Sequence, residues 1–219
     1  MERKIIVTGD NSKTLLIPDL DETYHSKHGA LNEARHVFIK HGLAEIKKEQ
    51  VNIFELGFGT GLNLLVTMEY LSNHPIQVNY SSIEKYPLPF SIIKEMGYDE
   101  LIDSSFSKTY LDAHESAWEE EVALTEQLTL LKQEGDIKSA LMENSKFDLI
   151  LFDAFGPRVQ PDLWSVDILF KMYSSLKLDG RLVTYCAQGQ FKRNLKAAGF
   201  KVYNVPGPPG KREMTIGLK

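Results

Sequence analysis

A glycine-rich turn between two apolar segments is the first feature of this sequence that could bind a ligand. Residues 51–56 are an apolar run of strand type, residues 62–71 have helical character, and the turn between them contains Gly57, Gly59 and Gly61. A strand, a tight turn and a helix bring backbone N–H groups to the carboxyl edge of a parallel sheet, where ligands bind. Glycine is needed where the backbone turns with positive φ or where a ligand touches it. The pattern therefore predicts a cofactor-binding loop.

The spacing within this loop separates two classes of cofactor. A dinucleotide-binding loop needs its third glycine at position 62, which is Leu62, and this counts against a pyrophosphate ligand. Glu55, just before the turn, suits a cationic cofactor with an amino group and a sulfonium, whereas an acid is poorly placed beside a pyrophosphate. S-adenosylmethionine carries no phosphate and fits both observations. The predicted cofactor loop consists of Glu55, Gly57, Phe58, Gly59, Thr60 and Gly61.

Two further acids are placed to bind the adenosine part of such a cofactor. Glu84 follows the predicted strand 78–83, 23 residues after Gly61, and a carboxylate there can accept hydrogen bonds from both ribose hydroxyls. The alternative for Glu84 is an exposed charge at the mouth of a loop. Asp136 and Ile137 precede the next buried strand. At this position, methyltransferases that bind S-adenosylmethionine on such a sheet often place an acid for the adenine amino group and an apolar neighbour for the adenine ring.

Asp153 is the predicted catalytic residue, because it directly follows the apolar strand 147–152 and so lies beside the cofactor. Methyl transfer is an in-line displacement at carbon, and the protein mainly has to align and deprotonate the acceptor. For an amine acceptor, the Asp153 carboxylate could accept a hydrogen bond from the nitrogen, and Phe155 could pack against the acceptor base or the sulfonium. The alternative for Asp153 is a cap of the following turn. No nucleophile triad, phosphate-binding Walker loop or metal-ligand spacing competes with this interpretation.

Strands that alternate with helices are expected to position these residues. Strands are predicted at 51–56, 78–83, 147–152, 181–185, 201–205 and 214–218, and helices at 62–71, 90–96, 115–131, 165–176 and 190–198. This order is typical of an α/β fold, a Rossmann-like class I methyltransferase with a mostly parallel, doubly wound sheet and an antiparallel C-terminal strand, in which a hairpin-like end adds an antiparallel edge. A β-hairpin at 4–17 and a helix at 29–41 precede it. We expect a single domain over 1–219, with residues 1–48 as an appendage and 49–219 as the core.

Composition and charge limit the classes of partner. No apolar run approaches the roughly 20 residues of a membrane helix, and the single cysteine, Cys186, excludes an internal disulfide; a cytoplasmic protein is expected. The chain carries a net charge of −5, but residues 181–219 hold eight basic residues against one acid, a net charge of +7. A basic end on an acidic protein predicts a localised anionic partner such as RNA. Solvated helix faces are the equal alternative.

Several motifs together resemble a known family. The N-terminal set includes Tyr24-His25-Ser26 and residues 29–38; the cofactor loop continues to Asn63; and Glu84-Lys85-Tyr86-Pro87 follows. The set is completed by Asp153-Ala-Phe155-Gly-Pro157, by residues 160–164 and 184–186, and by the Pro-Gly segment 206–214 that contains Lys211 and Arg212. Over nearly the whole chain this resembles the methyltransferase that completes 5-methylaminomethyl-2-thiouridine at the tRNA wobble position.

The resemblance implies a specific reaction and further site residues. The reaction is transfer of a methyl group from S-adenosylmethionine to the primary amine of 5-aminomethyl-2-thiouridine at position 34, in the anticodon loop of tRNA. The catalytic role falls on Asp153, and Asn63 and Lys85 join the cofactor site. Tyr24 and His25 are expected to close over the site, and Lys211 or Arg212 to contact phosphate.

In many bacteria this enzyme is half of a bifunctional protein whose other half is a flavin-dependent oxidase. The present chain is expected to be the stand-alone form, with a separate oxidase partner or another route supplying the aminomethyl precursor. Two alternatives stay open. The first is an aminopropyltransferase or small-molecule amine methyltransferase of the same fold, although an aminopropyltransferase typically has a second acid where Ala154 follows Asp153. The second is a non-catalytic cofactor-binding or RNA-binding module.

Overall fold

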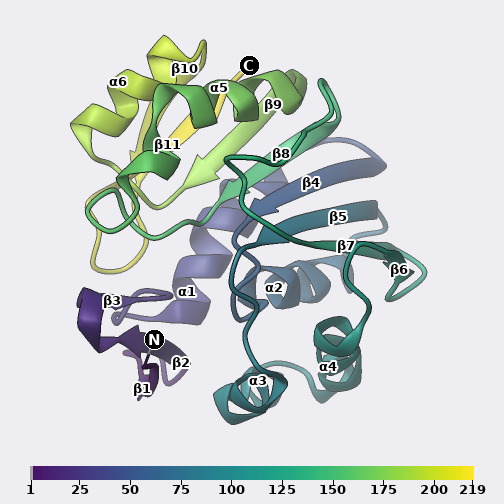
Figure 1. The fold of residues 1–219 in the computed structure, drawn as a ribbon. Coiled ribbons are helices and arrows are strands. Elements are labelled where there is room, and N and C mark those ends of the chain that lie inside the picture. The colour runs from purple at the N-terminus through teal and green to yellow at the C-terminus, as the bar shows by residue number, and fades with distance from the viewer. Residues whose placement is uncertain (1) are drawn as a thin grey trace.

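An eight-stranded sheet forms the centre of the fold in the computed structural model, which describes residues 2–219 (Figure 1). Its strands lie in the order β10-β11-β9-β8-β4-β5-β7-β6. Their bounds are β4 Gln50–Leu56, β5 Gln77–Glu84, β6 Glu121–Ala123, β7 Leu128–Glu134, β8 Phe147–Phe152, β9 Leu176–Thr184, β10 Lys201–Pro206 and β11 Glu213–Leu218. Strands β7, β5, β4, β8 and β9 are parallel. The predicted mostly parallel α/β sheet is therefore confirmed.

The central strands are buried because helices cover both faces of the sheet. Every residue of β8 is buried, as expected of a parallel strand with a helical layer on each side. One face packs against α1 (Ala30–Ala34), α2 (Leu62–Leu71), α3 (Phe90–Met96) and α4 (Ser107–Glu115). The other face packs against α5 (Val166–Ser175) and α6 (Gly189–Ala197). In Figure 1 these two layers lie on opposite sides of the strands, as the doubly wound arrangement requires.

The N-terminal appendage is a separate three-stranded sheet that lies beside the carboxyl ends of the central strands (Figure 1). The predicted hairpin is present: β1 (Lys4–Val7) pairs antiparallel with β2 (Lys13–Ile17), and β3 (Glu22–Thr23) adds to β2. The hairpin turns at Asn11, whose φ is +64°. Helix α1 then continues into a π-helical segment, Arg35–Lys40, within the region predicted as one helix. The division of the chain at residue 48 stays a prediction.

The helix predicted at 115–131 is wrong. Helix α4 ends at Glu115, and the rest of that range contains the antiparallel strands β6 and β7. Glu119 has a φ of +65°, which ends any helix there, and burial alternates along β7 with a period of two. Leu128, Leu130 and Lys132 face the interior. The acidic residues 119–121 belong to a turn and to the start of the edge strand β6.

The C-terminal strands are present and form an antiparallel hairpin at one edge of the sheet, as predicted. Strand β10 is the edge strand, and β11 lies between β9 and β10 and pairs antiparallel with both. Strand β9 begins at Leu176, five residues before the predicted start at 181. Among the described residues, no helix is long and apolar enough to cross a membrane.

Candidate active site

A cavity of about 450 Å³ opens at the carboxyl ends of β4, β5 and β8, where the topology brings the predicted site residues together. Its volume falls within the range of about 300 to 1,000 Å³ that is usual for small-molecule sites. The N-terminal appendage contributes one wall, through Ile17, Leu20 and Tyr24. The predicted residues that line the cavity are Tyr24, His25, Gly57, Phe58, Gly59, Asn63, Glu84, Lys85, Asp136, Ile137, Asp153 and Phe155.

The glycine-rich loop adopts the backbone conformation that its sequence predicts. Gly57, Gly59 and Gly61 have φ values of +90°, +49° and +68°, which side chains with a Cβ rarely adopt. The Gly57 N–H donates to the Ile83 carbonyl at 2.9 Å and the Gly59 N–H donates to Glu84 Oε2 at 3.0 Å. The loop is therefore joined to the end of β5, and Glu84 holds it from the cavity side.

Thr60 and Gly61 do not line the cavity; they contact helix α4 instead. The Thr60 carbonyl accepts hydrogen bonds from the Tyr110 hydroxyl at 2.7 Å and from His114 Nε2 at 3.2 Å. Burial and the nearby Lys132 ammonium lower the pKa of His114 to about 3, so this imidazole is neutral. A Cβ on Gly61 would lie 2.5 Å from His114 Nε2. The third glycine is thus required for packing as well as for backbone conformation.

One amide connects the two acids of β4 and β8. Asn63 Nδ2 donates to Glu55 Oε1 and to Asp153 Oδ2, each at 2.8 Å. Glu55 is fully buried beneath the cavity, and burial raises its pKa well above the ordinary value, against the effect of the Asn63 hydrogen bond. Glu55 Oε2 and Asn63 Oδ1 are buried acceptors without a hydrogen bond of good geometry. The Tyr80 hydroxyl lies beside Glu55, whereas Asn63 lines the cavity, so a ligand there could donate a hydrogen bond to Asn63 Oδ1.

Asp153 faces the cavity with a raised pKa. Burial raises the pKa of its carboxyl to about 7, with the Asn63 hydrogen bond acting in the opposite direction. The Glu33 carboxylate raises the pKa further and the Lys211 ammonium lowers it. Oδ1 accepts no hydrogen bond from any residue that the structure describes, which leaves it available to a ligand. A group with these properties can exchange a proton near neutral pH.

The residues predicted to bind adenosine also line the cavity. Glu84 Oε1 accepts from the Tyr86 N–H at 2.8 Å, so both its oxygens hold backbone around the cavity. Asp136 Oδ2 pairs with Lys85 Nζ at 2.9 Å, while its Oδ1 accepts from the Lys138 N–H at 2.9 Å. The Lys138 hydrogen bond and the Lys85 ammonium lower the pKa of Asp136. Ile137 is 3% exposed and supplies an apolar surface beside this carboxylate.

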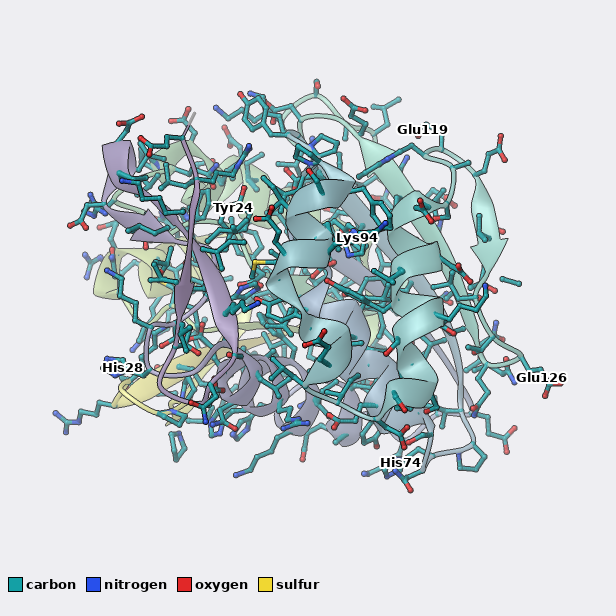
Figure 2. The ribbon with its side chains drawn as sticks, turned by 90° about the horizontal axis from the view of Figure 1, so that it is seen from below. Tyr24, His28, His74, Lys94, Glu119 and Glu126 are labelled. Carbon is teal, nitrogen blue, oxygen red and sulfur yellow. The ribbon has the colours of Figure 1, made fainter. Side chains whose placement is uncertain are left out.

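An aromatic pair flanks the cavity near Asp153. The rings of Tyr24 and Phe155 meet edge to face, with centroids 5.0 Å apart and an interplanar angle of 90°. Phe155 is fixed at both sides of its peptide, because its N–H donates to Gln160 Oε1 at 3.1 Å and its carbonyl accepts from Trp164 Nε1 at 2.8 Å. Tyr24 lies at the boundary between the appendage and the core (Figure 2) and also contacts Gly59.

The other predicted acceptor residues have different surroundings. His25 lines the cavity, and burial lowers its pKa to about 4. Lys211 does not line the cavity: its Nζ pairs with Glu33 Oε2 at 2.6 Å and lies 3.9 Å from the Tyr185 ring centroid. The phosphate contact predicted for Lys211 does not fit this arrangement, because its ammonium is already engaged. Arg212 is exposed outside the cavity.

Comparison with known proteins places the chain in a family. Residues 100–219, more than half of the chain, match the family described as S-adenosyl-L-methionine-dependent methyltransferase. The chain belongs to this family.

Relatives of this methyltransferase agree with the resemblance drawn from its motifs. It is 34% identical to the tRNA 5-methylaminomethyl-2-thiouridine biosynthesis bifunctional protein MnmC of Cupriavidus metallidurans, over 94% of this chain and 32% of that protein. It is 32% identical to the protein of the same name from Leptospira interrogans, over 97% of this chain and 35% of that protein. The chain thus spans about a third of the length of these relatives.

Solved structures confirm the methyltransferase fold. MnmC2 from Aquifex aeolicus is 28% identical, with a TM-score of 0.75 over 99% of this chain and 69% of that one. Spermidine synthase from Thermotoga maritima, at 14% identity, has a TM-score of 0.54 over 99% of this chain and 68% of that one. This second likeness shows the fold alone.

The cavity of the methyltransferase fits S-adenosylmethionine. Asn63 lines the cavity and its Oδ1 is a buried acceptor without a hydrogen-bond partner among the described residues, so a donor such as the amino group of the cofactor would satisfy it. The positive φ values of the loop bring backbone against the cavity without a Cβ in between. Glu84, Asp136 and Ile137, which were predicted to bind the ribose and the adenine, line the same cavity. Within the described part of the chain, no group of three His, Cys, Asp or Glu residues is arranged to hold a metal ion.

Gln160 and Arg3 are among the residues of the cavity wall that sequence reasoning missed. Gln160 fixes Phe155 through its backbone N–H, and its place in the motif 160–164 was the available signal. Arg3 lines the cavity from the segment before β1. No sequence pattern pointed to Arg3, because its approach to the site depends on how the appendage folds against the core.

Proposed function

We propose that this methyltransferase transfers a methyl group from S-adenosylmethionine to the primary amine of 5-aminomethyl-2-thiouridine at the wobble position of tRNA. The names of its relatives support the pathway. The observation that carries the proposal is the Asp153 carboxyl, with a pKa of about 7, beside the aromatic pair Tyr24–Phe155 and at the end of the cofactor loop.

Asp153 is suited to an amine acceptor in particular. S-adenosylmethionine supplies a methyl group on a sulfonium, which is already a good leaving group, so the site has to align a neutral amine with that methyl. An aliphatic ammonium must first lose a proton, and a carboxylate with a pKa near 7 can accept a hydrogen bond or a proton from it. Asn63 fixes Oδ2 of Asp153 and leaves Oδ1 for the amine, which orients the nitrogen lone pair.

The aromatic pair is suited to a base as the carrier of that amine. Sequence-specific RNA recognition commonly targets unstacked bases in loops and stacks them on aromatic side chains. Tyr24 and Phe155 offer such a surface at the mouth of the cavity, near Asp153. A wobble uridine turned out of the anticodon loop would stack there, with its 5-aminomethyl group directed at Asp153.

The decisive assay measures transfer of a labelled methyl group from S-adenosylmethionine to tRNA that carries 5-aminomethyl-2-thiouridine. We expect label in this tRNA and none in matched tRNA without the aminomethyl group. Unlabelled tRNA together with an alkylated free polyamine would overturn the proposal in favour of an amine transferase acting on small molecules. Ala154, which follows Asp153, places no second acid at that position to hold a polyamine. The separate oxidase partner stays a prediction.

A further inference from the structure

Arg3 is a cavity-lining cation without a counter-ion. Its Nε atom is buried and has no hydrogen-bond partner, and its guanidinium forms no ion pair with any described acid. The two lysines that line the same cavity are paired with acids: Lys85 with Asp136 at 2.9 Å and Lys138 with Asp162 at 2.6 Å. A buried N–H donor without a hydrogen-bond partner costs free energy, and an anionic ligand that accepts from the Arg3 guanidinium would remove this cost.

The polar neighbour of Arg3 does not supply that negative charge. The guanidinium lies beside the Tyr24 hydroxyl and opposes the burial that raises the pKa of this phenol. The pKa of Tyr24 nevertheless stays above its ordinary value of 10.0, so Tyr24 is neutral at physiological pH. A planar guanidinium binds a phosphate through two parallel N–H donors, a geometry that lysine lacks.

Arg3 and Asp153 come from different parts of the cavity wall. The charged groups that shift the pKa of Asp153 are Glu33 and Lys211, not Arg3. Arg3 belongs to the appendage wall with Tyr24, whereas the groups assigned to the cofactor come from the ends of β4 and β5 and the loop after β7. A ligand that reaches from Asp153, past Tyr24, to Arg3 has an amine at one end and an anion at the other.

We propose that Arg3 binds a phosphate group of the acceptor nucleotide while the base lies against Tyr24 and Phe155. The inference rests on the proposed function, because it assigns the backbone contact of the same acceptor. Arg3 then sets the depth to which the nucleotide enters, since a phosphate held at the mouth fixes the distance from the ribose to Asp153. Phosphate contacts position a nucleic acid without reading its sequence.

The test compares two ligands that differ only in phosphate. The probes are 5-aminomethyl-2-thiouridine as the free nucleoside and as its 3′,5′-bisphosphate, each titrated into the protein saturated with S-adenosylhomocysteine. Wild-type protein is expected to bind the bisphosphate at least about tenfold more tightly, the effect of one charge-assisted pair. Arg3→Gln is expected to remove this preference and to leave the affinity for the nucleoside unchanged. Arg3→Lys is expected to keep part of it.

Lys4→Gln is the matched control, because it removes the same charge one position away. The Lys4 side chain is 58% exposed and pairs with Glu2, outside the cavity. This variant is expected to keep the full phosphate preference. With whole tRNA, Arg3→Gln is expected to reduce the slope of log Kd against log salt concentration by about 1, and Lys4→Gln to leave it unchanged. Melting temperatures of both variants verify that they fold.

Several results would overturn the inference. A bisphosphate preference that survives in folded Arg3→Gln excludes the phosphate contact, as does a preference lost equally in Lys4→Gln. Weaker binding of S-adenosylmethionine to Arg3→Gln, with the nucleotide unaffected, would assign Arg3 to the cofactor carboxylate instead. If wild-type protein neither binds the two probes nor methylates the tRNA, the proposed function fails as well. Methylation of the tRNA with no phosphate preference rejects the Arg3 inference alone.

Discussion

The side-chain amide nitrogen of Asn63 lies 2.8 Å from Asp153 Oδ2. Asn63 is the second residue of α2, and it fixes the carboxyl of the residue that directly follows β8. The same nitrogen contacts Glu55 at the end of β4. Two acids that would repel each other are thereby held by one donor. One oxygen of Asp153 remains free for a ligand.

Asp153→Asn is expected to keep S-adenosylmethionine binding and to lose most turnover. Asparagine preserves the size of the side chain but cannot accept a proton, and general-base catalysis contributes about 10² to 10⁴ in rate. Isothermal titration of the cofactor and kcat for tRNA methylation separate the two effects. A loss of cofactor affinity as large as the loss of kcat would show that Asp153 is a cofactor ligand or a structural cap.

The pH dependence of kcat/KM is expected to report Asp153. Activity requires the carboxylate, so kcat/KM should rise with pH and its acidic limb should lie near the pKa of about 7, or below it once the cationic cofactor is bound. The Asn63 hydrogen bond lowers this pKa, so Asn63→Ala should move the limb to higher pH. The same limb in wild type and Asn63→Ala would contradict this role, even if the variant were slower.

Glu84→Gln is expected to weaken cofactor binding by about tenfold or more, because the ribose and the Gly59 N–H lose a charged acceptor. Glu134→Gln is the matched control. Glu134 ends the neighbouring strand in register with Glu84 but does not line the cavity. Cofactor affinity measured by titration should fall in the first variant only. Equal affinities would indicate that Glu84 supports the loop without contacting the cofactor.

Gly61→Ala is expected to destabilise the fold by about 2 kcal/mol or more. The residue has a φ of +68°, and the added Cβ would lie 2.5 Å from the buried His114 side chain. Gly135→Ala serves as the control for stability, since the nearest atom to its Cβ is Ile83 Cδ1 at 3.7 Å; we expect a change under about 0.5 kcal/mol. Urea unfolding measures both variants. A neutral Gly61→Ala would mean that the loop can relax.

Sequence patterns predicted the parts of the fold in which burial or backbone conformation restricts the residue types of a short segment. The apolar run of β8 and the glycines of the loop were readable because complete burial and positive φ each restrict the residue types at a position. The bounds of α2 and α3 were predicted correctly as well. The segment 115–131 failed because acids and apolar residues mix there in a way that fits a helix. Lys132, a long charged residue, completes the interior face of β7, where its Nζ donates to the His114 carbonyl at 2.9 Å.

The site was predictable where residues follow strand ends, and unpredictable where distant segments meet. Glu84 and Asp153 could be placed because parallel strands end at one edge of the sheet. Lys211 appeared to be a surface cation, yet it pairs with Glu33 of α1, 178 positions away in sequence. Arg3 and the insertion of β11 between β9 and β10 likewise depend on tertiary contacts. His28 lies beside the C-terminal loop for the same reason (Figure 2).

We propose the wobble aminomethyl group of tRNA as the acceptor of this methyltransferase. The most direct measurement incubates tRNA carrying 5-aminomethyl-2-thiouridine with S-adenosylmethionine and the protein, digests the tRNA to nucleosides and identifies the product by mass spectrometry. The account predicts conversion to 5-methylaminomethyl-2-thiouridine by wild-type protein and almost none by Asp153→Asn. Unchanged 5-aminomethyl-2-thiouridine with an active, cofactor-binding protein, or methylation at another nucleoside, would contradict it.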